Sequence, residues 1–324
     1  MNSRRYFLQQ SALAATGIAI ANPFNLFAQP GSAFFGNNKR NCLTLLHTND
    51  LHNLLNPVSY ESYSQLGGFE NTVRVISKLK KENSNVLLLD AGDIFNGNIN
   101  HQQEQETTIK IMQAAGYDAV VLGNRDYETG FDYLQQQWQK NNTSLIAGNY
   151  TFGSSAVQSL HQPYKIIYKG NLKIGITAVG INMNGLVAGV IHRGVNHKDP
   201  VSTLNSIARY LKKEEKCDMV VCLSHLGYKN IKAIDDISLA KQTQNVDVII
   251  GGHSHTFMSA PAIVLNKNQQ EVIINHAGFG GIALGNMTIS FDDYGNKTMV
   301  DFNNRMIGTE NNNWEYNRAA VVAA

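Results

Sequence analysis

The stretch NVLLLDAGD, residues 85–93, has the pattern of a β-strand that is buried on both faces. Its apolar run is continuous over residues 86–89, whereas a strand with one solvated face alternates apolar and polar residues. A small-residue turn follows directly and ends in Asp93. The stretch therefore predicts a central strand of a parallel sheet, with a chemistry-bearing side chain just beyond its carboxyl end.

Similar apolar runs alternate with helical patterns along most of the chain. The other expected strands are residues 42–50, 117–124, 172–180, 218–225 and the end of 238–255. The expected helices are residues 70–83, 106–116, 201–216 and the start of 238–255. From residue 261 to about 306 the pattern becomes strand after strand. This order predicts an α/β fold with mixed sheets, in which parallel strands are covered by helices and antiparallel strands are added late.

Composition narrows the classes of partner. The 324 residues are 43% hydrophobic, enough for one large or two small domains with a continuous core. Formal charge is 27 − 25 = +2, so the chain has no basic field for a nucleic acid polymer or anionic lipid. Three cysteines are too few for a disulfide framework, and Cys217 and Cys222 are expected in the core, on opposite faces of a strand.

The N-terminal segment has the features of an export signal. Arg4 and Arg5 precede an apolar run over residues 12–21, followed by small residues and a proline. The SRRYFL core at residues 3–8 resembles a twin-arginine signal, which implies export of the folded protein to the periplasm. The alternative is a membrane anchor, but the apolar run is shorter than the ~20 residues that span a bilayer. We expect no membrane contact after removal of the signal.

Most of the expected strands end in side chains that bind metals. These clusters are HTNDLH (Asp50, His52), AGD (Asp93), LGNRD (Asn124, Asp126), LSHLG (His225) and GGHSHT (His253, His255). A single such cluster is typical of a helix cap or a structural histidine. Five of them converge, because ligands of an open α/β sheet gather beyond the carboxyl ends of its strands.

The mixed set of ligand atoms predicts borderline divalent ions such as Zn, Mn or Fe. Imidazole nitrogens suit these metals, and carboxylate and amide oxygens suit the harder among them. A carboxylate on a sharp turn can bridge two ions about 3.5–4 Å apart, an arrangement that supports hydrolytic displacement. Asp93 is the candidate bridge.

Five motifs of the sequence resemble, in order, the five blocks of calcineurin-like metallophosphoesterases: DLH, GDIFNG, GNRD, SHLG and GGHSH. The opening TLLHTNDLH is similar to the 5'-nucleotidase branch of that family. The resemblance implies a four-layer αββα sandwich that holds two divalent metal ions. It places Asp50, His52, Asp93 and His255 around one ion, and Asp93, Asn124, His225 and His253 around the other. The expected organisation is a signal at 1–28, a flexible lead at 29–41, the catalytic domain at 42–308 and a tail at 309–324.

Two departures from the family pattern bear on activity. The third block of the family reads Gly-Asn-His-Asp/Glu, whose histidine steadies the phosphate or protonates the leaving oxygen, and Arg125 stands there. Glu128 occupies the position of an acidic partner in similar enzymes. We do not expect this protein to carry the C-terminal nucleoside-binding domain of 5'-nucleotidases, so a separate chain resembling that domain is a candidate partner.

Arg125 can carry out only part of the task of a histidine. A guanidinium binds phosphate oxygens in a bidentate manner but has no proton to donate near pH 7. We therefore predict Asn124, Arg125 and Glu128 as catalytic residues; the alternative for Arg125 is an ion pair with Glu128 or Asp126 that closes the loop. Other histidines could supply the proton, although each is more typical of a surface or loop residue: His101, His192, His197 and His276.

These observations predict an exported two-metal hydrolase of a small phosphorylated substrate, such as a nucleotide or sugar phosphate. Two alternatives stay open. One is a hydrolase of another anion in the same fold, such as a thiosulfohydrolase. The other is a weakly catalytic or non-catalytic metal-holding subunit that completes a separate substrate-binding chain.

Overall fold

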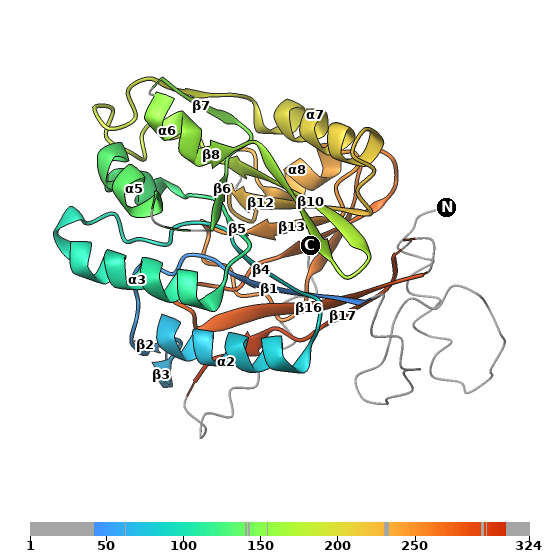
Figure 1. The fold of residues 1–324 in the computed structure, drawn as a ribbon, viewed down its shortest axis with the longest axis horizontal. Helices are drawn as coiled ribbons and strands as arrows, with labels where there is room; N and C mark the ends of the chain where they lie inside the picture. Colours follow the sequence, from blue (N-terminus) through green and yellow to red (C-terminus); the bar gives the residue numbers. More distant parts are fainter. Residues whose placement is uncertain are drawn as a thin grey trace. The chain divides into compact units, whose positions relative to one another are not determined.

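Two mixed β-sheets form the centre of the computed structural model, which describes residues 42–308 apart from 62, 140, 142, 154, 230–232, 293–294 and 296 (Figure 1). The first sheet has the order β17-β16-β1-β4-β5-β6-β8, with β18 paired to β16. Its strands are β1 (Cys42–Thr48), β4 (Val86–Asp90), β5 (Ala119–Val120), β6 (Ser144–Ile146), β8 (His161–Gln162), β16 (Ala283–Phe291), β17 (Lys297–Phe302) and β18 (Arg305–Met306).

The second sheet has the order β14-β15-β13-β12-β10-β9. Its strands are β9 (Tyr164–Lys169), β10 (Leu172–Gly180), β12 (Met219–His225), β13 (Val248–Gly251), β14 (Ala262–Leu265) and β15 (Glu271–Asn275). Two small antiparallel pairs flank the sheets: β2 (Val58–Tyr60) with β3 (Tyr63–Leu66), and β7 (Tyr150–Phe152) with β11 (Val195–His197).

The strand directions confirm the expectation of mixed sheets. Strands β1, β4, β5, β6 and β8 run parallel, as do β10, β12, β13 and β15. The late strands β14, β16, β17 and β18 are antiparallel additions. Strand β15 differs from the other late strands, because the chain returns through β14 and then pairs β15 parallel to β13.

The core between the sheets explains why the strands are continuously apolar. Side chains alternate across a strand, so Leu87 and Leu89 of β4 contact the cluster between the two sheets. Val86 and Leu88 belong instead to the cluster beneath the helices on the outer face. Both faces of β4 are therefore buried against apolar side chains, as its sequence predicts.

Helices cover the outer face of each sheet and complete a four-layer αββα sandwich. The predicted fold class is thereby confirmed. Figure 1 shows α2 and α3 against the first sheet, and α7 and α8 against the second. The helices are α2 (Phe69–Glu82), η2 (Ile99–His101), α3 (Gln102–Ala115), α4 (Asn124–Glu128), α5 (Phe131–Trp138), α6 (Ser155–Leu160), α7 (Pro200–Lys213) and α8 (Asp236–Gln242). Within the described residues, no helix combines the length and apolar character that crossing a bilayer requires.

The two cysteines near β12 are core residues, as expected, but they do not lie on opposite faces. Cys217 and Cys222 are both buried and belong to the same apolar cluster beneath α7. Cys217 precedes the strand, which begins at Met219, so strand alternation does not relate the two.

The expected signal, lead and tail at 1–28, 29–41 and 309–324 lie outside the described residues.

Candidate metal centre

The predicted metal ligands lie just beyond the carboxyl ends of parallel strands. Asp50 and His52 follow β1, Asp93 follows β4, and Asn124 begins α4 after β5. In the second sheet His225 ends β12, and His253 and His255 follow β13. The strand ends are aligned, since Thr48 pairs with Asp90 and Asp90 with Val120. The sandwich thus brings ligands from both sheets to one edge.

The first ligand group consists of Asp50, His52 and His255, which offer ligand atoms within 4.8 Å of one another. Nε2 of His52 lies 2.9 Å from Nε2 of His255. Oδ1 of Asp50 lies 3.9 Å from Nε2 of His52 and 3.5 Å from Nε2 of His255. Two imidazole nitrogens and a carboxylate oxygen therefore face a common point.

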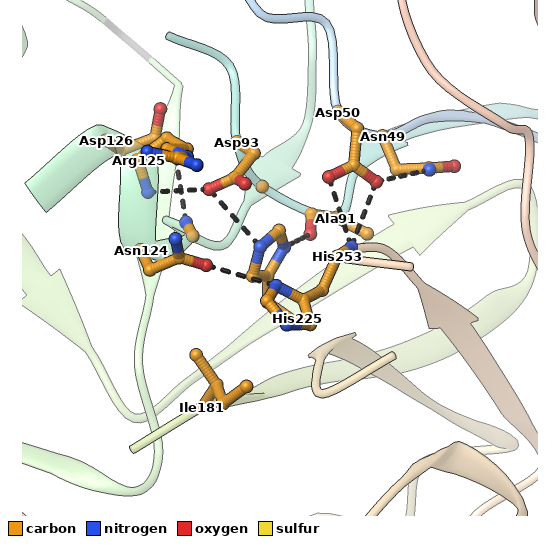
Figure 2. A network of polar contacts seen from close by, with 12 residues as sticks. Asn49, Asp50, Ala91, Asp93, Asn124, Arg125, Asp126, Ile181, His225 and His253 are labelled. Atoms are coloured by element: carbon orange, nitrogen blue, oxygen red, sulfur yellow. Dashed lines mark hydrogen bonds and ion pairs between the residues drawn. The ribbon is translucent and has the colours of Figure 1, made fainter. Parts of the chain in front are cut away.

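The second ligand group consists of Asp93, His225 and His253, again within 4.8 Å of one another. Figure 2 shows these side chains and Asn124 pointing toward one another. Oδ1 of Asp93 lies 3.2 Å from Nε2 of His225, and Oδ1 of Asn124 lies 3.1 Å from Nδ1 of His253. Asn124 thus adds an amide oxygen to this group.

Backbone carbonyls select the ring nitrogens that face the two groups. Nδ1 of His225 donates to the carbonyl of Ala91 at 2.7 Å, and Nδ1 of His52 donates to that of Phe95 at 3.2 Å. In the neutral imidazole each Nε2 then carries a lone pair, the arrangement found in metal-ligating histidines. Nε2 of His225 is buried and makes no hydrogen bond among the described residues. Such an orphaned nitrogen beside a carboxylate fits a divalent ion.

A glycine keeps open the space between Asp93 and His225. A Cβ atom at Gly123 would lie 2.1 Å from Oδ1 of Asp93 and 2.4 Å from Nε2 of His225. Any larger residue would intrude between the two ligand atoms. The residues present therefore fit a pair of divalent ions in both donor chemistry and space.

The backbone of the ligands is unusual. Asp50, His52, Asp93, His253 and His255 all have positive φ angles, between 50° and 72°. Non-glycine residues seldom adopt this left-handed conformation, and they are enriched in it at functional sites. Tight turns directly after the strands are what direct these side chains back over the sheet edge.

Burial and charge set the protonation states that ligation needs. Burial lowers the pKa of His52 and of His253, so both imidazoles are neutral at pH 7. For Asp93, burial opposes ionisation, but His225, His52 and the Arg125 amide outweigh it and lower the pKa. Burial also lowers the pKa of His225, yet the negative charge of Asp93 outweighs it and raises the pKa to about 10, as a group that favours a cation in this place would.

Arg125 and Glu128 form an ion pair at the rim of the second group. Nη1 of Arg125 lies 3.2 and 3.1 Å from the two carboxylate oxygens of Glu128. The Arg125 side chain is 51% exposed, and its backbone N–H donates to Oδ1 of Asp93 at 2.8 Å. Asp126 is not a ligand, because its oxygens accept from the backbone amides of Phe95 and Gly123 at 2.7 and 2.8 Å.

Two polar residues near the centre differ from what the sequence suggested. His276 follows the end of β15 but is not a surface residue, since it is fully buried with Nε2 2.7 Å from Oδ2 of Asp236. Asn49, absent from the expected set, donates from Nδ2 to Oδ2 of Asp50 at 2.7 Å and to the carbonyl of Gly278 at 2.6 Å. Its place directly before Asp50 was the only signal in the sequence.

Comparison with known proteins identifies the family. A profile described as calcineurin-like phosphoesterase matches residues 43–257, a range that contains both ligand groups. The chain belongs to this family.

Its relatives include 5'-nucleotidases. The chain is 29% identical to the 5'-nucleotidase of Bos taurus over 280 residues, 78% of this chain and 47% of the relative. A 5'-nucleotidase precursor from Thermus thermophilus superimposes with a TM-score of 0.75 at 25% identity, over 82% of this chain and 55% of that one. A sulfate thiohydrolase from the same organism shares the fold, with a TM-score of 0.71 at 16% identity over 87% of this chain and 58% of that one. The chain spans about half the length of the curated relatives it matches.

Proposed function

We propose that this protein is a divalent-metal-dependent phosphoester hydrolase whose substrate is a nucleotide or a small sugar phosphate. The observation that carries the proposal is the pairing of two ligand groups with a partly exposed cation, Arg125, at their rim. Each ligand group combines imidazole with carboxylate, the donor set of Zn, Mn or Fe. Membership of the calcineurin-like phosphoesterase family supports the same activity.

The bound ions would activate water and neutralise the charge of the phosphoryl group. The chain's own residues would do the positioning. Asp93 would lie between the two ligand groups, since it interacts electrostatically with both His225 and His52. Asn124 would supply its amide oxygen beside His253. Arg125 would move from Glu128 to the phosphate oxygens, and Glu128 would hold the guanidinium ready until substrate binds.

A metal analysis combined with a phosphate-release screen tests this function. The protein is purified, loaded separately with Mn²⁺, Zn²⁺ or Fe²⁺, and assayed against nucleotides, sugar phosphates and phosphodiesters. We expect two ions per chain and phosphate release that a chelator abolishes. Two bound ions without release from any phosphoester would contradict the proposal. Turnover of a thiosulfonate substrate would then indicate another anion hydrolase, and its absence a metal-holding subunit.

We also propose export to the periplasm, on the basis of Arg4 and Arg5 ahead of the apolar run. A receptor that reads the arginine pair distinguishes guanidinium from ammonium. Replacing both residues by lysine should therefore retain the precursor in the cytoplasm, although the charge is unchanged. Fractionation of cells that express each form gives the measurement, and undiminished export of the double variant would contradict the proposal.

A further inference from the structure

A buried polar network adjoins the ligands of the second sheet without belonging to either ligand group. Its centre is the carboxylate of Asp236, whose Oδ2 accepts from Nε2 of His276 at 2.7 Å and whose Oδ1 accepts from the hydroxyl of Ser224. All three side chains are fully buried. They come from three elements, since Ser224 lies in β12, Asp236 begins α8 and His276 directly follows β15. We call these three residues the Asp236 network.

The Asp236 network contacts both strand ends that carry ligands in the second sheet. Ser224 immediately precedes the histidine ligand at the end of β12, and its backbone pairs with Gly251 of β13. A Cβ atom at Gly251 would lie 2.0 Å from Nε2 of His276 and 2.1 Å from Oδ2 of Asp236. The buried pair therefore packs directly on the backbone of Gly251, two residues before the ligand His253.

The network also reaches the first sheet, through Asn49. The N–H of Ala277, the residue after His276, donates to Oδ1 of Asn49 at 2.8 Å. Nδ2 of Asn49 donates in turn to the carboxylate of the ligand Asp50 (Figure 2). The segment that follows β15 is therefore joined by hydrogen bonds to ligand-bearing segments of both sheets.

Stability alone does not account for a buried carboxylate and imidazole at this place. Taking such a pair out of water offsets most of its attraction, so well-packed apolar residues often stabilise a core equally well. In addition, Nδ1 of His276 is buried and makes no hydrogen bond among the described residues, which adds a further cost. The pair does supply directional hydrogen bonds, and a buried network of this kind fixes one arrangement of the elements that it joins.

We propose that Asp236 and His276 are positioning residues for the metal centre, which fix the strand ends of the second sheet so that its histidine ligands converge with Asp93. The inference rests on the proposed function, because it assumes that the two ligand groups bind divalent ions. Neither residue belongs to a ligand group. Their loss should therefore weaken metal binding without removing a ligand, and residues that support metal ligands typically contribute about 10- to 100-fold in affinity or activity.

Cobalt binding to the metal-free protein tests the proposal without an activity assay. Metal is removed with a chelator, and Co²⁺, which imidazole and carboxylate both bind, is added while the visible absorption is recorded. Ser224→Ala removes only the hydroxyl that joins Asp236 to β12, and it should raise the Kd for Co²⁺ by roughly 10- to 100-fold. The spectrum at saturation should also differ from that of the wild type, because the visible bands of Co²⁺ depend on ligand geometry.

Two variants of His276 separate hydrogen bonding from packing. His276→Leu fills the space but donates no hydrogen bond to Asp236, and it should weaken Co²⁺ binding as Ser224→Ala does. His276→Gln keeps an N–H donor for Asp236 and should restore both the affinity and the spectrum of the wild type. A purely structural role would give no such rescue, since glutamine replaces the ring no better than leucine does.

Thr177→Val is the matched control. The Thr177 hydroxyl is also part of a buried strand next to β12, and it donates to the carbonyl of Pro163 at 2.9 Å, a bond that involves no ligand-bearing segment. The control should lower the unfolding temperature of the metal-free protein about as much as Ser224→Ala but leave the affinity and spectrum of Co²⁺ unchanged.

The outcomes distinguish this inference from the proposed function. Wild-type protein that binds no Co²⁺ would overturn both. Wild-type binding with the same Kd and spectrum in Ser224→Ala and His276→Leu would overturn the positioning role alone and leave the metal centre intact. Circular dichroism of the metal-free variants identifies any that fail to fold; if His276→Leu is one of them, Ser224→Ala, the smaller change, decides.

Discussion

Asp93→Asn is expected to reduce the metal content from two ions per chain to one or none. Phosphate release should fall by more than about 100-fold, because mutation of residues that only support the ligands already costs about 10- to 100-fold in metal affinity or activity. Asp93 supplies an oxygen 3.2 Å from Nε2 of His225 and lies close enough to His52 to influence its pKa. Asparagine keeps the size of the side chain but removes the negative charge that attracts both cations. Elemental analysis of the purified variant and a phosphate-release assay provide the measurements.

A matched control shows whether the loss is specific. Asp132→Asn makes the same change at an exposed residue in the first turn of α5, away from both ligand groups, and should retain two ions. Retention of two ions in Asp93→Asn at saturating metal would contradict the role of Asp93 as the shared ligand. A variant that fails to fold is recognised by circular dichroism, and Asp93→Glu then tests whether a carboxylate at this position restores metal.

Arg125→Ala is expected to raise KM and to lower kcat/KM by about 1.5–3 kcal/mol, roughly 10- to 150-fold. The side chain is exposed enough to reach a ligand, and its backbone is anchored through the hydrogen bond of its N–H with Asp93. In the proposed role its charge would act on the anionic oxygens of the substrate in the ground and transition states alike. Glu128→Gln is the companion variant: if Glu128 only holds the guanidinium between turnovers, its loss should change kcat/KM less than the loss of Arg125. Equal kinetics for wild type and Arg125→Ala would leave Arg125 with the loop-closing role that its ion pair with Glu128 suggests.

The leaving group reports whether the centre lacks a general acid. A guanidinium donates no proton near pH 7, so aryl phosphates should react much faster than alkyl phosphates, whose leaving oxygen needs protonation. Arg125→His should narrow this gap by improving the alkyl substrates selectively. Equal rates for both classes in the wild type would mean that another residue supplies the proton; His276 is excluded from that task by its burial against Asp236.

The strands could be predicted from the sequence because a strand that is buried on both faces has a continuous run of apolar residues. Leu87 and Leu88 have to be apolar since they face different cores, one between the sheets and one beneath α2 and α3. The directions of the late strands were harder to predict. Whether β15 pairs parallel or antiparallel depends on the return through β14, which no residue pattern within β15 encodes.

The convergence of the candidate ligands could be predicted for a related reason: each lies at or after the end of a strand, and parallel strands end at a common edge. Their roles depend on contacts that are distant in sequence. The carbonyls of Ala91 and Phe95 choose the ring nitrogens of His225 and His52, and backbone carbonyls have no residue signature. The contact between the rings of Tyr60 and Phe279 could not be predicted, because the two residues are more than 200 positions apart in the sequence and no local pattern links them.

Residues 91–95 serve both ligand groups at once. This one segment contains Asp93, orients His225 through the carbonyl of Ala91, and orients His52 through that of Phe95. Its backbone also pairs with the turn after β1, since the N–H groups of Asp50 and His52 donate to the carbonyls of Gly92 and Asp93. The two ion sites would therefore be thermodynamically linked. An ion that ordered this segment would reduce the entropy that the second ion must remove, and loading would favour the fully occupied centre over the half-filled one.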